Sequence, residues 1–120
     1  MLLLLAVSTV AQAHKPSDSY LAVKVEAGRI EGQWDIALRD LEYAIGLDAD
    51  GNGEITWGEL SARHDQLAAY ALARLQVSSA EAACTLKVTD HLVDGHSDGA
   101  YAVIRFAADC PAAGSLKIRY

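Results

Sequence analysis

The chain has 120 residues, of which 52% are hydrophobic and 22% charged, which suffices for one domain with a modest core and not for two. This composition excludes a largely disordered chain. The net charge of −6 arises from 16 acidic and 10 basic residues, and no run of basic residues provides the surface that nucleic acid or an anionic membrane requires.

The first 13 residues form an uncharged apolar segment that ends in Ala11-Gln12-Ala13. An apolar region followed by an A-x-A site is typical of a secretory signal peptide, and the segment is shorter than the roughly 20 residues that span a bilayer. We therefore expect residues 1–13 to be a signal peptide and residues 14–120 to be a single exported domain, at the periplasmic or extracytoplasmic face of a membrane. The usual basic residue near the start is missing, which favours a true start a few residues upstream. A buried N-terminal strand or helix is the alternative to a signal peptide.

Hydrophobic and polar residues alternate in segments 20–26 and 30–38, on either side of Gly28. Alternation with a period of two predicts half-buried strands, and the short connection predicts an antiparallel hairpin.

Residues 48–59 read DADGNGEITWGE and match the calcium-loop pattern D-x-[DN]-x-[DN]-G-x5-E at every constrained position. A calcium ion needs six to eight oxygen ligands on a tightly coiled loop. The predicted ligands are Asp48, Asp50, Asn52, Glu54 through its backbone carbonyl, Thr56 and Glu59. Gly53 permits the sharp turn, and Ile55 is expected to point into the core. The alternative is an acidic surface loop that matches the pattern by chance.

Helical periodicity on both sides of this loop predicts a helix over 40–47 and a longer helix over 57–75. Thr56 and Glu59 have the spacing of a capping box at the start of the second helix. We expect Glu59 to cap that helix without metal and to turn toward the ion when calcium binds. His64 falls on the apolar stripe of this helix, where we expect a core histidine with one hydrogen-bond partner.

Three further strands are predicted over 84–88, 102–110 and 116–120. Cys84 and Cys110 are the only cysteines, and in an exported chain they are expected to form a disulfide, a soft-metal pair being the alternative. The predicted fold class is therefore α+β, an antiparallel sheet of about five strands with an EF-hand helix-loop-helix inserted after the second strand.

The polar segment 90–99 is expected to be a solvated hairpin turn. Transition-metal binding through His91 and His96 is an alternative reading of this segment. A related alternative function is copper or nickel binding or delivery, in which a mature N-terminal His14 offers its amine and imidazole and other histidines complete the site.

The stretches HKPSDSY (14–20), WDIALRDL (34–41), GLDADG (46–51) and ITWGE (55–59) resemble the amino-terminal exported region of HupE/UreJ-like bacterial membrane proteins. The resemblance covers most of residues 14–120, and the six predicted calcium ligands carry over onto it. It implies an envelope-facing domain that precedes a multi-helix membrane part, which is missing from this chain. Any nickel handling that the family name implies would belong to the missing part.

The sequence thus predicts a domain that binds one Ca²⁺ ion through a single loop, with a structural role for the ion. No motif of a nucleophile or of an acid pair outside the loop points to catalysis, so an enzyme is not expected. The expected partners are calcium and a downstream membrane segment, not nucleic acid, and no surface in the sequence identifies a protein partner.

Overall fold

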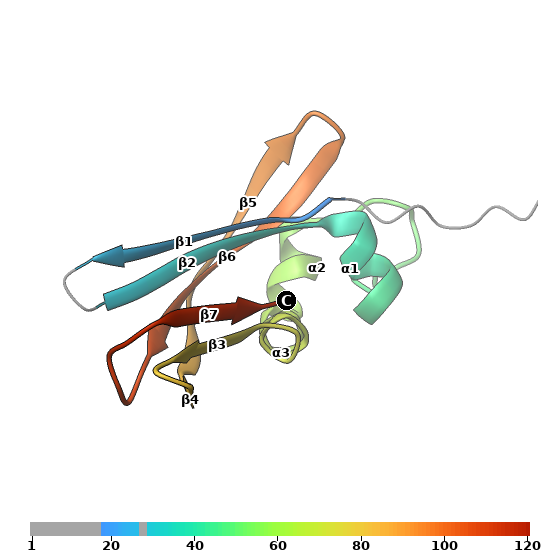
Figure 1. Ribbon diagram of the computed structural model, residues 1–120. Coiled ribbons are helices and arrows are strands. Elements are labelled where there is room, and N and C mark those ends of the chain that lie inside the picture. The colour runs from blue at the N-terminus through green and yellow to red at the C-terminus, as the bar shows by residue number, and fades with distance from the viewer. Residues whose placement is uncertain (1–17, 27–28) are drawn as a thin grey trace, which may run out of the picture.

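The computed structural model describes residues 18–26 and 29–120, which form two antiparallel sheets and three helices (Figure 1). The predicted α+β class is therefore confirmed. The predicted signal peptide, His14 and the predicted turn at Gly28 lie outside the described residues.

The larger sheet has four strands in the order β1-β2-β6-β5. These strands are β1 (Tyr20–Glu26), β2 (Arg29–Ala37), β5 (Thr85–His96) and β6 (Gly99–Asp109). β1 and β2 form the predicted hairpin, in which Leu21 lies opposite Trp34. Both residues belong to the face that packs on the core, as the alternation of the sequence predicts.

The β5–β6 hairpin differs from the prediction, because only Ser97 and Asp98 lie between its two strands. The predicted turn segment is mostly strand, with Asp94 paired with Tyr101 and His96 paired with Gly99. β6 contains an apolar stretch that pairs along its length, and this pairing overrides the weak strand preference of aspartate and glycine in β5.

A second, three-stranded sheet has the order β4-β3-β7. Its strands are β3 (Gln76–Ser79), β4 (Ala82–Ala83) and β7 (Leu116–Arg119). The structure thus has seven described strands in two sheets, where about five in one sheet were expected. β3 and β4 are too short for alternation to be visible, and the predicted last strand pairs with β3 instead of joining the larger sheet.

The turn between β3 and β4 contains two residues with left-handed backbone, Ala80 with φ 51° and Glu81 with φ 64°. A side chain in this conformation costs about 1–2 kcal/mol. We expect Glu81→Gly to raise the free energy of unfolding by about 0.5–1 kcal/mol, measured by urea denaturation. Gln76→Gly, at an exposed position of β3, is the matched control and should lower stability. Equal effects of the two substitutions would contradict the interpretation.

The helices lie between β2 and β3 in the chain, and α1 (Leu38–Ile45) begins directly at the end of β2. The predicted long second helix is wrong: it divides into α2 (Trp57–Ala62) and α3 (His64–Leu72) at Arg63, where φ is −110° and ψ is 10°. Leu60 and Leu67 are buried in the same core on the two sides of this break, so tertiary packing holds the bend. None of the helices in the described part of the chain has the length and apolar character needed to cross a membrane.

The helices and the smaller sheet lie together on one side of the larger sheet (Figure 1). A single hydrophobic core among the described residues joins these three parts. Its largest fully buried side chains are Phe106, Leu41, Leu47, Leu60, Leu67 and Ile104. Three of these leucines, Leu41, Leu47 and Leu60, flank the predicted calcium loop, so both ends of that loop are anchored in the core.

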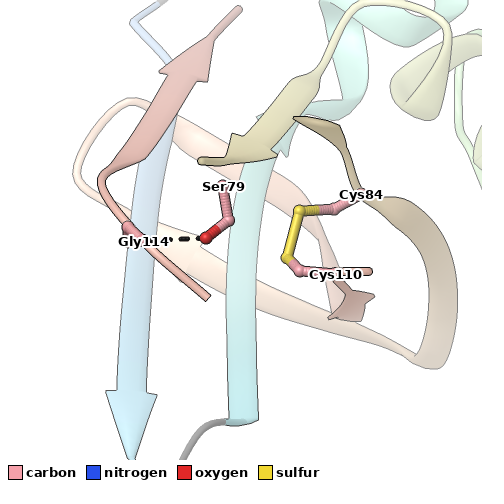
Figure 2. The surroundings of a disulfide bond; sticks show 4 residues. All are labelled: Ser79, Cys84, Cys110 and Gly114. Carbon is pink, nitrogen blue, oxygen red and sulfur yellow. Dashed lines mark hydrogen bonds between the residues drawn. A yellow bond between two sulfur atoms is a disulfide. The ribbon is translucent and has the colours of Figure 1, made fainter. Parts of the chain in front are cut away.

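Figure 2 shows the predicted disulfide between Cys84 and Cys110, which is confirmed with an S–S distance of 2.09 Å. Cys84 precedes β5 and Cys110 follows β6, so the bridge closes the open end of this hairpin. The backbone N–H of Cys84 also donates to the carbonyl of Val77 in β3, at 2.8 Å. The disulfide therefore lies where the two sheets meet.

Candidate metal site

The predicted calcium loop connects α1 to α2 and turns through glycines with left-handed backbone. Gly46 ends α1 with φ 70°, and Gly51 and Gly53 have φ values of 69° and 84°. Gly53 thus adopts the sharp turn that was predicted to require glycine at this position of the pattern. Ile55 is partly buried and packs against the core, as expected.

Three carboxylates of the loop converge on one point. Oxygen atoms of Asp48, Asp50 and Glu59 all lie within 4.8 Å of one another. Two oxygens bound to the same calcium ion lie at most about 5 Å apart, which is twice the Ca–O distance. The spread of the three carboxylates therefore fits one hard cation and needs no large rearrangement of the loop.

Backbone amides hold these carboxylates in place despite their like charges. Asp48 accepts from the N–H of Gly53 at 2.8 Å, and this bond is the main reason that the pKa of Asp48 is lowered. Glu59 accepts from the N–H of Thr56 at 3.0 Å, the main cause of its lowered pKa, and from that of Ala49 at 2.6 Å. Both groups therefore stay ionised at neutral pH, which concentrates negative charge at the site.

The predicted capping box is confirmed in both directions. The Thr56 hydroxyl accepts from the N–H of Glu59 at 3.1 Å, and the Glu59 carboxylate accepts from the N–H of Thr56. Glu59 thus joins the first turn of α2 to the start of the loop at Ala49. Its carboxylate occupies the capping position while it lies within reach of Asp48 and Asp50.

The other predicted ligands contribute to the shape of the loop. The side-chain oxygen of Asn52 accepts from the N–H of Glu54 at 2.9 Å, and the Thr56 hydroxyl belongs to the capping box. The Glu54 side chain is not part of the carboxylate cluster.

Glu42 is a residue of the site that the sequence analysis missed. Its carboxylate accepts from the backbone N–H groups of Leu47 and Asp48, the second at 2.7 Å, and so fixes the entry of the loop. Only a weak feature of the sequence points to Glu42. A negative charge near a helix C-terminus is unfavourable in the field of the helix dipole, so an acidic residue at this position indicates a further interaction.

The three histidines in the described part of the chain do not form one site. His91 and His96 point to opposite faces of β5, so the structure does not bring them together. His96 bonds to the buried Asp35 at 2.9 Å and stacks on Tyr20 with ring centroids 4.5 Å apart. His91 instead stacks on His64. His14 lies outside the described residues, so the alternative that depends on its amine stays a prediction.

Comparisons of this chain with protein-family models, curated proteins and solved structures find no match.

Proposed function

We propose that residues 48–59 form a single EF-hand-type loop that binds one Ca²⁺ ion, and that the ion has a structural role. The observation that carries the proposal is the convergence of Asp48, Asp50 and Glu59 within 4.8 Å. All the predicted ligand atoms are oxygens. Calcium prefers oxygen ligands, whereas the softer transition ions favour imidazole nitrogen and thiolate sulfur. The twelve-residue spacing, with a glutamate at the last position, favours calcium over the smaller, strictly octahedral magnesium ion.

A structural role follows from where the ends of the loop lie. Asp48 comes directly after Leu47, and Glu59 directly before Leu60, and both leucines are at most 2% exposed. An ion bound to both carboxylates would thus link the end of α1 to the start of α2 beside the core. It would also neutralise part of the repulsion among the three carboxylates.

The cellular setting that we propose is the outer side of a bacterial membrane. The Cys84–Cys110 disulfide supports an oxidising compartment such as the periplasm. The resemblance to HupE/UreJ-like proteins supports a domain that is exported and continues into a membrane segment. Calcium modules outside the cytosol work with a Kd of about 10⁻⁴ to 10⁻³ M, so a single weak loop suits that setting.

We expect calorimetric titration of the full chain to show one Ca²⁺ site with a Kd of about 10⁻⁴ to 10⁻³ M. Glu59→Gln should weaken binding by more than about tenfold, because Glu59 is the residue that closes the site with both oxygens. At 10 mM Ca²⁺, binding of this strength adds about 1–3 kcal/mol to the free energy of unfolding, so the melting temperature should rise.

Glu54→Gln is the matched control, since it makes the same chemical change in the same loop at a residue that offers only its carbonyl. It should bind calcium nearly as well as the unaltered chain. Equal losses of calcium affinity in the two variants would mean that the affinity depends only on the net charge of the loop. A chain that binds no calcium at 10 mM would refute the proposed function.

A further inference from the structure

Two histidines from distant parts of the chain stack on each other. His64 is the first residue of α3 and His91 lies in β5, and their ring centroids are 3.9 Å apart with the planes inclined by 6°. The edge of the Trp57 ring contacts His64, at a centroid distance of 5.5 Å. The fold therefore places four imidazole nitrogens together on the side of the sheet where α3 packs.

These nitrogens have unused bonding capacity. Within residues 18–26 and 29–120, no hydrogen bond from another side chain or from the backbone reaches either imidazole, so the prediction of one hydrogen-bond partner for His64 is wrong. Nε2 of His64 is buried without a partner. A buried polar atom without a partner is costly, and such atoms in a folded protein commonly have a functional reason. An imidazole nitrogen is also the commonest protein ligand of transition metals.

The surroundings of the pair suit a cation. The two histidines line a hollow of about 390 Å³ together with Asp65, Asp90 and Thr89. Burial lowers the pKa of His91, so at neutral pH its imidazole is mostly in the neutral form that binds metals. Asp65 is exposed and close enough to act electrostatically on His91, so its carboxylate can turn toward the rings. Asp90 lies on the opposite face of β5, where its carboxylate accepts from the backbone N–H of His91 at 2.9 Å.

We propose that His64 and His91 form a binding site for a divalent transition ion such as Cu²⁺ or Zn²⁺, with Asp65 as a third ligand. Imidazole and carboxylate together suit these ions, and copper binds most tightly among them. One ion cannot lie in the planes of two parallel stacked rings. Binding therefore requires one ring to turn about its Cβ–Cγ bond, and the hollow beside the pair provides room for that movement.

Copper titration of the full chain tests this site, with tryptophan fluorescence as the readout. Trp57 lies against His64, so Cu²⁺ bound at the pair should quench the Trp57 emission, and Trp57→Phe identifies the contribution of this residue.

Saturating Ca²⁺ keeps copper from the loop carboxylates, and a Glu59→Gln chain measured in parallel shows whether any copper still binds there. His64→Phe and His91→Phe retain a stacked ring but remove the nitrogen donors. His14→Asn and His96→Gln are the controls at the other two histidines.

We expect saturable quenching by one equivalent of Cu²⁺, weakened about tenfold or more in His64→Phe and in His91→Phe and unchanged in the two controls. Electron paramagnetic resonance of the copper-loaded, unaltered chain should show coupling to two nitrogens, a result that does not depend on whether a variant folds. Three outcomes would overturn the proposal. Copper binding could survive both phenylalanine variants, or it could be lost in either histidine control or in Glu59→Gln. The bound copper could also show no nitrogen coupling. Absence of binding at 100 equivalents of Cu²⁺ would also overturn it.

Discussion

Replacing both Cys84 and Cys110 by alanine is expected to lower the free energy of unfolding by about 3–4 kcal/mol. The bridge links residues 26 positions apart and so restricts the unfolded chain, which is the main source of its stabilisation in the chain-entropy model. For a domain of this size such a loss is a large share of the total stability. Urea denaturation of the variant and the oxidised chain, followed by circular dichroism, measures the difference.

The structure indicates why the loss should extend beyond the β5–β6 hairpin. Thr85 and Asp109 are the last paired residues at the open end of that hairpin, and Cys84 and Cys110 are their direct neighbours in the chain. The same corner carries the smaller sheet, where the buried Ser79 donates to the carbonyl of Gly114 at 3.4 Å. Chemical reduction of the unaltered chain is the control and should reproduce the effect of the substitutions. A difference below about 1 kcal/mol in both experiments would show that the paired strands already hold this corner.

The parts of the fold that could be predicted are those in which one segment carries its own pattern. β1 and β2 have seven and nine residues with clear alternation, and their hairpin agrees with the prediction. β3 and β4 have four and two residues, and the turn between them, Ala80-Glu81, contains none of the residues that favour left-handed backbone. β3 pairs with β7, about 40 residues further along the chain, and no local pattern reveals this pairing.

The same distinction applies to the candidate sites. The calcium loop has its predicted ligands within twelve consecutive residues, so their spacing alone predicted that carboxylates would meet. Glu42 lies outside the pattern, although it positions Asp48. The pairing of His64 with His91 depends on how α3 packs against β5, and the break at Arg63 that orients α3 was not predicted. Sequence spacing could not have chosen His64 over His96 as the neighbour of His91.

Gly32 and Phe106 form a close contact between the neighbouring strands β2 and β6. They lie opposite each other in β2 and β6, and a Cβ added to Gly32 would lie 2.1 Å from Cζ of the Phe106 ring. The three atoms nearest to that Cβ all belong to this ring, which therefore covers the glycine. Phe106 is only 1% exposed, so its ring cannot move aside without displacing other core residues.

Gly32→Ala is therefore expected to cost about 1–3 kcal/mol of stability by overpacking, and Phe106→Ala about 3–5 kcal/mol by leaving a cavity. The double variant should lose less than the sum of the two, because removal of the ring leaves space for the added methyl group. Urea denaturation of all four chains gives a coupling energy, for which we expect about 1–3 kcal/mol in the favourable direction. Ala22→Gly, an exposed position in the neighbouring strand β1, measures the effect of glycine in a strand without a covering ring. Strictly additive losses would mean that the backbone around Gly32 moves to accept a side chain and that Phe106 does not require a glycine beneath it.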